Sequence, residues 1–273
     1  PAEISNIDSS FLTVEAGGQY VHRIGDDHAL TGGYGGRYDN FFEIGNKDVL
    51  DNTVFARYAY AVRQIPGNVV ASLQGSYGHT RVGGSRFRDN LGLRPSVSFR
   101  PANNFSTEVF YGRSLNVIHA APTGNEGVTD RDSTLSVVGA RAVVDVPDTG
   151  LVVSVGAARL HNNADGTDHS YRGNQYSVGA RMTLFDAYTV TGEVAKTHYN
   201  YTSAHSLAPN PANGAGFFFA RRDEITTVNL RVSRPVMDGV DVFAKFDYTR
   251  AQSNLLLFTY SQNVFGAGVI ARF

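Results

Sequence analysis

The chain has 273 residues, a formal net charge of −1 and no cysteine. A balanced charge gives no bulk reason to expect nucleic-acid binding, and the lack of cysteine excludes disulfides and structural thiolate metal sites. No stretch approaches the roughly 18 uncharged apolar residues that a membrane-spanning helix needs, which excludes a helical membrane protein. Glycine, tyrosine and phenylalanine are abundant, with 29, 14 and 17 residues, and aromatic residues favour strands.

Alternation of apolar and polar residues predicts thirteen strands. We expect them at residues 10–24, 28–43, 53–65, 69–82, 91–101, 105–119, 133–146, 151–162, 175–185, 189–203, 224–236, 241–252 and 262–273. The alternation places apolar side chains on one face of each strand and polar side chains on the other. Soluble sandwiches and propellers alternate too, but a soluble strand averages about 5–6 residues, whereas a tilted membrane strand needs about 9–11. These lengths favour strands that cross a membrane.

Short turns and longer polar stretches alternate between the strands. Turn clusters rich in Gly, Pro, Asn and Asp lie at residues 25–27, 66–68, 101–104, 147–150, 186–187 and 237–239, and longer loops at 44–52, 83–90, 120–132, 163–174 and 204–223. Short turns on one rim and long loops on the other are typical of Gram-negative outer-membrane barrels. The sequence therefore predicts an all-β, transmembrane, antiparallel up-and-down β-barrel. We expect one domain over residues 1–273, which stands alone or forms the C-terminal part of a longer protein.

The strand count and two arginines need further assumptions. Single-chain bacterial barrels have an even number of strands, so fourteen are expected in total, the extra one supplied by residues 1–9 or by a segment upstream. The total is twelve if the first segment lies outside the wall. Arg113 and Arg159 fall on the apparently apolar face, where we expect bulges or rim positions. Without tryptophan, an aromatic girdle has to come from residues such as Tyr34, Tyr38, Tyr58, Tyr60, Tyr77, Tyr111 and Tyr248.

Arginine recurs at inward-reading positions of five successive descending strands. Neighbouring descending strands are roughly 10 Å apart, so the five side chains could form a ladder that favours anions. Alternatively, these arginines pair with interior carboxylates and fill the barrel with a polar network, and the sequence leaves both interpretations open. The predicted pore-lining residues are Arg57, Arg94, Arg141, Arg181, Arg231, Glu108, Asp145, Glu193, Lys245 and Asp247, with Glu15 and Asp39 as further carboxylates.

The longest predicted loop, residues 204–223, carries Phe217, Phe218 and Phe219, followed by Arg221 and Arg222. Three phenylalanines are unusual on a solvated loop, so this segment is expected to fold into the lumen as a constriction or to dock a partner. The alternative is that the phenylalanines extend a strand above the bilayer.

A rim hydrolase is the alternative from another class. Asp165, Asp168, His169 and Ser170 supply an acid, a base and a nucleophile in one polar loop. Such residues are common in polar loops and no strained nucleophile motif accompanies them, so we do not expect an enzyme. No phosphate loop or metal-ligand spacing is found, and we expect neither a metal nor another cofactor.

The chain ends in a strand whose last residue is aromatic. Phe273 and Gly268 stand where the assembly signal of outer-membrane barrels has them, although Ala271 replaces a usual aromatic residue. Residues 253–263, followed by Gly266 and Phe273, resemble the ending of the surface lipoprotein assembly modifier family and of related barrels that follow periplasmic tetratricopeptide repeats. The resemblance implies a barrel of about fourteen strands that translocates or assembles an exported molecule, with a periplasmic repeat domain as partner.

Together these features predict a pore or export barrel of the bacterial outer membrane, passing solutes or a secreted polymer through an arginine-lined lumen that favours anions. A non-conducting structural or surface-assembly barrel and a rim hydrolase are the alternatives. Expected partners are outer-membrane lipid and lipopolysaccharide, the barrel-assembly machinery through the C-terminal strand, and a periplasmic repeat domain or secretion partner, but not nucleic acid.

Overall fold

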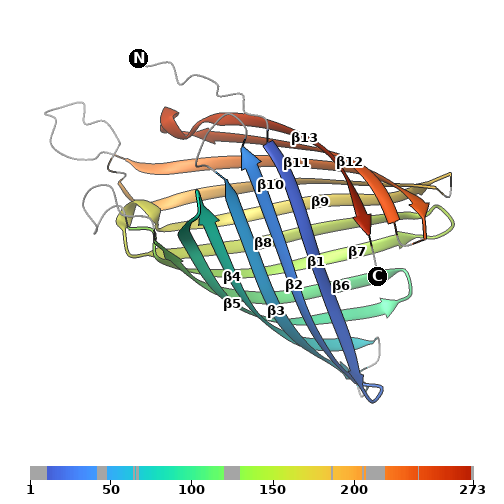
Figure 1. Cartoon of the computed structure of the whole chain (residues 1–273). Helices are drawn as coiled ribbons and strands as arrows, with labels where there is room; N and C mark the ends of the chain where they lie inside the picture. Colours follow the sequence, from blue (N-terminus) through green and yellow to red (C-terminus); the bar gives the residue numbers. More distant parts are fainter. Residues whose placement is uncertain are drawn as a thin grey trace, which may run out of the picture.

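A computed structural model describes residues 11–41, 48–63, 65, 68–119, 130–185, 187–204, 206, 219–238 and 240–271. Within them, thirteen β-strands form one sheet in which every strand pairs antiparallel with the next along the chain (Figure 1). The strands are β1 (Phe11–Ile24), β2 (His28–Phe41), β3 (Val49–Val62), β4 (Val69–Val82), β5 (Ser85–Ala102), β6 (Phe105–Ile118), β7 (Ser133–Val146), β8 (Leu151–Ala164), β9 (Tyr171–Leu184), β10 (Tyr188–Ala204), β11 (Ala220–Met237), β12 (Val240–Ser253) and β13 (Tyr260–Ala271). The predicted all-β class and the thirteen strands are confirmed.

Helical structure is limited to two 3₁₀ turns in the described part of the chain, η1 (Thr167–His169) and η2 (Leu256–Phe258). Neither they nor any other described segment forms a helix long and apolar enough to cross a membrane.

The connections define two ends of the barrel. The turns after β1, β3, β5, β7, β9 and β11 are short, and we call their side the tight-turn end; the other side is the long-loop end. Positive φ angles tighten several of these turns, at Gly25 (63°), Asn68 (50°), Asp148 (62°) and Gly150 (64°). About 9–11 residues of tilted strand cross a bilayer, so the 18-residue strands β5 and β11 project beyond it at the long-loop end.

The prediction of a long loop at residues 83–90 was wrong. Only Gly83 and Gly84 connect β4 with β5. Both have positive φ angles, 57° and 78°, as the central residues of a type I′ turn do, and the right-handed twist of paired strands favours this turn. The polar residues that follow belong to β5 and extend this strand at the long-loop end.

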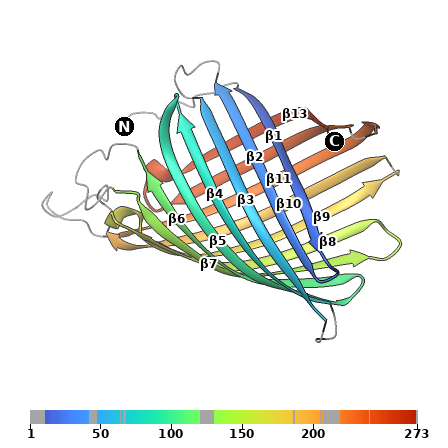
Figure 2. The same cartoon turned by 60° about the horizontal axis from the view of Figure 1, so that its bottom comes forward.

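The sheet curls round on itself. In Figures 1 and 2, strands β1–β5 run obliquely across the set from β7 to β13, the arrangement that the twist of long strands produces when a sheet curves into a barrel. Strands β1 and β13 run in the same direction, and no ladder joins them within the described residues. An odd number of antiparallel strands leaves its edge strands parallel, so the fourteenth strand stays a prediction; residues 1–9 lie outside the described residues.

The register assigns side chains to two faces, because directly opposed residues of an antiparallel pair point to the same side. Leu30, Tyr58, Leu73 and Pro95 oppose one another in turn from β2 to β5, and this mainly apolar face is the outward one. It also carries the seven tyrosines of the expected girdle, Tyr34, Tyr38, Tyr58, Tyr60, Tyr77, Tyr111 and Tyr248. The other face carries most of the buried polar side chains of the described strands and faces inward; they are Asp39, Thr80, Ser96, Asn162, Thr197 and Asp223.

Arg113 on β6 and Arg159 on β8 stay on the outward face. The ladders of both strands run through these positions without a shift of register, so the bulges considered there do not occur. Both arginines lie in the half of their strand that is nearer the long-loop end.

Candidate functional site in the barrel interior

The five arginines of the predicted ladder lie on the inward face, but they form three groups rather than one ring. Arg57 on β3 and Arg94 on β5 both oppose Gln74 on β4, which separates them by roughly 10 Å. Arg141 on β7 forms a second group with Glu108, its direct partner on β6. These groups lie beside each other around one part of the wall.

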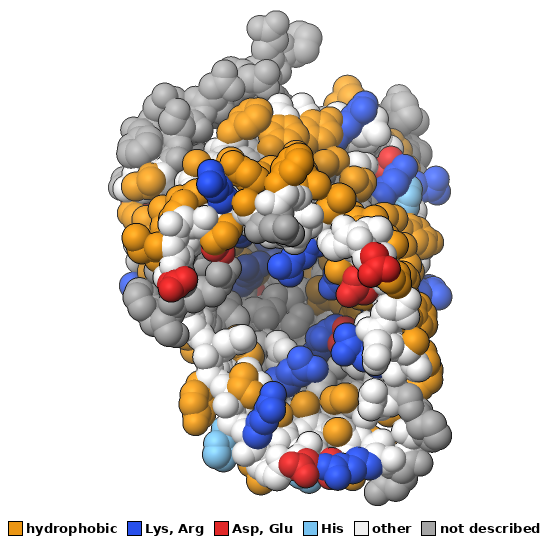
Figure 3. All heavy atoms as spheres, turned by 90° about the vertical axis from the view of Figure 1, so that its right-hand side faces the viewer, with side chains coloured by type: hydrophobic (Ala, Val, Ile, Leu, Met, Phe, Trp, Pro, Cys, Tyr) orange, Lys and Arg blue, Asp and Glu red, His pale blue; other side chains and the backbone are white. Residues whose placement is uncertain are grey.

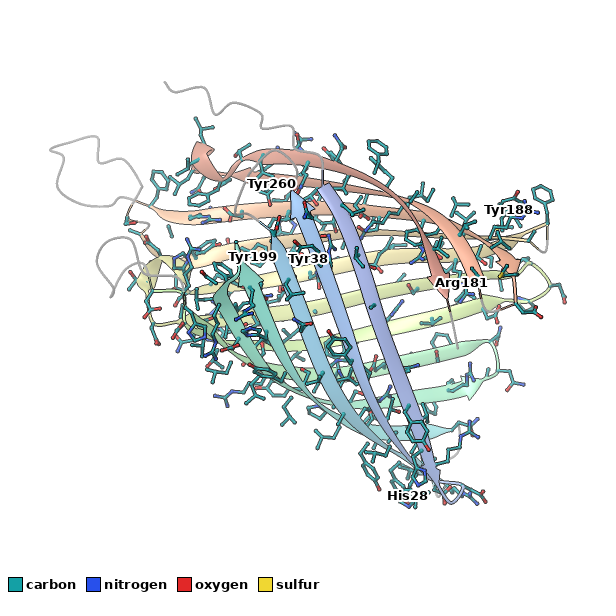
Figure 4. All side chains as sticks on the ribbon, in the orientation of Figure 1. His28, Tyr38, Arg181, Tyr188, Tyr199 and Tyr260 are labelled. Carbon is teal, nitrogen blue, oxygen red and sulfur yellow. The ribbon has the colours of Figure 1, made fainter. Side chains whose placement is uncertain are left out.

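A third group follows a single row across β9 to β12. Arg181 and Arg231 both oppose Thr191, and Arg231 also opposes Lys245. Arg181 lies near the tight-turn end, as Figure 4 shows. The row therefore places three cations close together on the inward side of that end, with Arg231 and Lys245 on adjacent strands about 5 Å apart in their backbones.

A polar cavity of about 240 Å³ is bordered by Arg94 and the second group and extends to Glu193 on β10. Arg94 Nη1 is 3.1 Å from Glu108 Oε1, and Arg141 Nη2 donates a hydrogen bond of 3.1 Å to Ser154 Oγ. The side chains that give the cavity its character are Arg94, Glu108, Phe110, Arg141, Gln175, Ser177 and Glu193. Such a mixture of donors, acceptors and one ring suits a small hydrophilic solute.

Two arginines are positioned by a repeated three-part arrangement. The ring of Phe110 lies against Gly139, its direct partner on β7, where an added Cβ would come 2.5 Å from the ring. The guanidinium of Arg94 lies over the same ring, with Cζ 4.2 Å from the ring centroid. Glycine is needed because the ring occupies the space of a side chain, and the ring in turn holds the arginine by a cation–π contact.

The same arrangement recurs at the other side of the wall. Phe243 covers Gly268, where an added Cβ would lie 2.8 Å from the ring, and Arg231 stacks on Phe243 with Cζ 4.0 Å from the centroid. Gly268 thus has a packing role in the described structure, beside the assembly role expected for it. Phe273, the other residue of that expected signal, lies outside the described residues.

The interior charges are only partly paired. Arg94 pairs with Glu108, and Lys245 Nζ lies 3.7 Å from Asp247. Glu15 and Asp39 pair with Arg37, which the sequence interpretation had not singled out. The ladder arginines that make no ion pair with any described residue are Arg57, Arg141, Arg181 and Arg231, and among the predicted pore-lining carboxylates Asp145 and Glu193 also make none.

Arg231 shows the consequence most clearly. Its Nη2 is buried and has no hydrogen-bond partner among the described residues, although the guanidinium stacks on Phe243. A buried donor without a partner is costly, so this nitrogen is free to bind an acceptor that enters the barrel. Seen from the tight-turn end, Lys, Arg, Asp and Glu side chains border a central hollow (Figure 3).

The interior is packed near the long-loop end on the side of β8 to β12. The rings of Tyr171 and Tyr199 meet edge to face at 4.9 Å, and Tyr201 lies 5.6 Å from Tyr171. Burial raises the pKa of Tyr171, the first residue of β9, to about 12. The buried hydrophobic residues of the described chain lie in or just after β8, β10 and β12; they are Leu160, Ala195, Ala251 and Leu255.

An arginine closes the packed cluster. Arg221 Cζ lies 3.4 Å from the centroid of Phe258 and 4.6 Å from that of Tyr201. Its Nε donates to both carboxylate oxygens of Asp223, at 2.9 and 2.8 Å, and the two side chains are only 14% and 5% exposed. A buried, bidentate pair stacked on aromatic rings fixes the end of β11 against η2.

Arg221 and Arg222 therefore do not belong to the predicted constriction loop. They are residues of β11 and point to opposite faces, so Arg221 is packed inside and Arg222 is exposed outside. Phe219 immediately precedes the strand and is 36% exposed. Phe217 and Phe218 lie outside the described residues, so the constriction stays a prediction for them.

The residues considered for a hydrolase have structural contacts instead. Asp168, 3% exposed, accepts hydrogen bonds from the backbone N and the hydroxyl of Ser206. The hydroxyl of Ser170 accepts from Ala164 N at 2.9 Å and donates to Ala164 O at 3.2 Å. These bonds tie the loop after β8 to its neighbours.

A cluster that the sequence interpretation missed lies on the outward face at the long-loop end. Asp89 accepts hydrogen bonds from His79 Nδ1 (2.7 Å), His119 Nε2 (2.7 Å), Tyr77 Oη (3.0 Å) and Arg86. The bonds from His79 above all, then Arg86 and His119, hold the pKa of Asp89 well below its usual range. The residues come from three strands, which a single-sequence pattern does not connect.

No group of three or more His, Asp or Glu in the described part of the chain is arranged to hold a metal ion.

These features define the class of protein. A single up-and-down antiparallel sheet of long strands, apolar outside, charged inside, and with tight turns at one end, is a β-barrel of the bacterial outer membrane.

Comparison with known proteins gives structural similarities only. No protein-family model matches the chain, and neither does any curated protein sequence. Among solved structures, OmpT folded in vitro, an outer-membrane protein of Vibrio cholerae, has 11% identity and a TM-score of 0.47, with 99% of each chain covered. The ferric citrate transporter FecA in its unliganded form has 11% identity and a TM-score of 0.42 over 93% of this chain and 46% of its own. The siderophore receptor PirA of Acinetobacter baumannii has 10% identity and a TM-score of 0.42, covering 94% and 48%.

Proposed function

We propose that this barrel is a channel for small hydrophilic solutes across the outer membrane, with a preference for anions. The observation that carries the proposal is the set of inward-facing arginines without a carboxylate partner among the described residues, Arg57, Arg141, Arg181 and Arg231. A fixed guanidinium binds carboxylates and phosphates by two parallel hydrogen bonds, and rings of such groups favour anions in pores.

The row at the tight-turn end is the strongest support for anion preference. Arg181 on β9, Arg231 on β11 and Lys245 on β12 lie in one row across the inward face, and only Lys245 has a carboxylate within ion-pair distance, at 3.7 Å. The unpaired carboxylates Asp145 and Glu193 oppose this preference, so we expect selectivity of severalfold rather than exclusion of cations.

Conductance in planar lipid bilayers tests the proposal. The full chain should give discrete ion-conducting steps. In a KCl gradient, the reversal potential should lie between zero and the chloride equilibrium potential. The variant Arg181→Gln with Arg231→Gln should shift that potential toward zero. Its control is Arg222→Gln with Arg250→Gln, which removes two arginines from the outward face and should leave the potential unchanged. Traces that stay closed at all voltages would contradict the channel.

A second candidate is a non-conducting structural or surface-assembly barrel. The packed cluster of Tyr171, Tyr199, Tyr201 and the Arg221–Asp223 pair favours it, because it narrows the interior near the long-loop end. The C-terminal resemblance to the surface lipoprotein assembly modifier family belongs to this candidate, as does a periplasmic repeat domain as partner. If the wild type is silent and Tyr201→Ala conducts, the closed barrel is supported.

A further inference from the structure

The outward face carries a cluster of basic residues where an apolar surface is expected. Arg113 on β6 opposes Ser136, which opposes His161 on β8, and His161 opposes Arg172 on β9. Arg159 lies one pleat below His161 on the same face. The four basic side chains thus occupy neighbouring positions on three strands, within roughly 10 Å of the middle of the cluster.

These arginines are exposed and uncompensated. All four basic side chains of the cluster are exposed, and no described carboxylate forms an ion pair with Arg113, Arg159 or Arg172. An unpaired arginine on the lipid-facing side of a barrel is destabilising near the middle of the bilayer and costs little near its surface. Their place within six residues of the long-loop end of β6 and β8 puts them at the outer surface of the membrane.

An apolar groove adjoins the cluster. It crosses the outward face of β3 to β6, has a volume of about 1060 Å³, and has Arg113 in its wall. Its other main lining residues are Tyr77, Leu91, Leu93, Pro95 and Tyr111. Small residues make room for it, since an added Cβ at Gly75 would meet no atom within 4 Å.

We infer that this surface is a binding site for lipopolysaccharide, with the lipid phosphates on Arg113, Arg159 and Arg172 and an acyl chain in the groove. Arginine forms bidentate hydrogen bonds with phosphate, which removes the cost of an unpaired charge at the membrane surface. An arginine in the wall of an apolar groove matches a ligand that joins phosphate to hydrocarbon. The position at the long-loop end assigns the ligand to the outer leaflet. The inference does not depend on whether the barrel conducts.

Binding of purified lipopolysaccharide to the detergent-solubilised barrel tests the site. Arg113→Gln with Arg159→Gln should weaken binding about tenfold or more, because each basic side chain near a membrane surface contributes on the order of fivefold. The matched control, Arg222→Gln with Arg250→Gln, removes the same charge from β11 and β12 on the same face and should leave the affinity unchanged. Heat-modifiable migration on gels confirms that each variant is folded.

Two further probes separate the parts of the site. Gly75→Leu fills the groove without removing charge and should weaken binding of lipopolysaccharide, whereas dephosphorylated lipid A should lose its dependence on the two arginines. Equal losses in the arginine variant and its control would overturn the site. Phosphatidylglycerol that competes as well as lipopolysaccharide would overturn the choice of ligand.

Discussion

The two ends of the barrel interior are built on different principles. At the long-loop end, the side chains of β8 to β12 pack into a cluster with a buried Arg221–Asp223 pair and three tyrosines. At the tight-turn end, Arg181, Arg231 and Lys245 stand in a row with little compensation. The first end resembles a small protein core, and the second resembles a binding surface with unpaired donors.

This difference indicates which end stabilises the fold and which end solutes pass. A buried ion pair whose partners also stack and hydrogen-bond is expensive to break, because one charge is then left without compensation. Interior arginines that lack a carboxylate add no ion pair to the stability of the fold, and their donors are free for solutes. Substitutions at the long-loop end should therefore change mainly the free energy of unfolding, and substitutions at the tight-turn end should change mainly the conductance.

The largest effect is expected for Asp223→Ala. Arg221 would stay 14% exposed against Phe258 and Tyr201 with no carboxylate, so the free energy of unfolding should fall by about 3–5 kcal/mol. Denaturant unfolding of the barrel in lipid vesicles measures this loss. Arg222→Ala, on the outward face of the same strand, should cost far less; equal losses would show that Arg221 and Asp223 do not form a core.

A smaller loss is expected at the wall itself. Gly139→Ala places a Cβ 2.5 Å from Phe110 and 3.0 Å from Ala157 O, so the ring and Arg94 have to move. The expected cost is about 1–3 kcal/mol of overpacking. Gly75→Ala is the matched control, because its Cβ meets open space. Phe110→Ala should remove most of the penalty when combined with Gly139→Ala, and a strictly additive double variant would argue against the stacking.

The packed end should also respond to alkaline pH. Burial raises the pKa of Tyr171 to about 12, above its ordinary value of 10.0, so the folded state holds this proton more tightly than the unfolded state does. The stability from this group is complete below pH 10 and is lost as the pH rises through about 12. Tyrosinate absorbance and unfolding curves across this range measure it. A Tyr171→Phe variant that loses stability over the same window to the same degree would exclude Tyr171 as the cause.

The smallest effect is expected for Arg231→Gln. The side chain has no ion pair with the described residues, and its stacking on Phe243 is worth about 0.5–1 kcal/mol. The free energy of unfolding should therefore change by about 1 kcal/mol or less. The reversal potential, in contrast, should shift toward the value expected for cation flow. A large loss of stability without a change of potential would reverse the roles of the two ends.

Much of the fold could be predicted from periodicity. The thirteen strands and their two faces follow from alternation, since each strand of a barrel meets lipid on one side and water on the other. The inward position of Arg94, Arg141 and Arg231 follows from the same pattern. The turn at Gly83 and Gly84 could not be told from a loop, because Ser85 and the residues after it are polar in an extended strand as they would be in a loop.

The packing of the site could not be predicted from a single sequence. Arg221 looked like part of a loop, and only the pairing of β10 with β11 shows that it faces inward beside Tyr201. The Asp89 cluster draws on three strands, and the stacking of Arg94 on Phe110 depends on Gly139 of the next strand. Local alternation specifies which face a residue occupies, but not which residue stands beside it.

The sequence by itself determined a barrel with an apolar exterior and a charged interior, because lipid and water act on each strand separately and leave a period of two. Only the tertiary structure decided how the interior is divided. The register between strands sets which charges meet a carboxylate, which stack on a ring and which stay free, and that register depends on all the strands together.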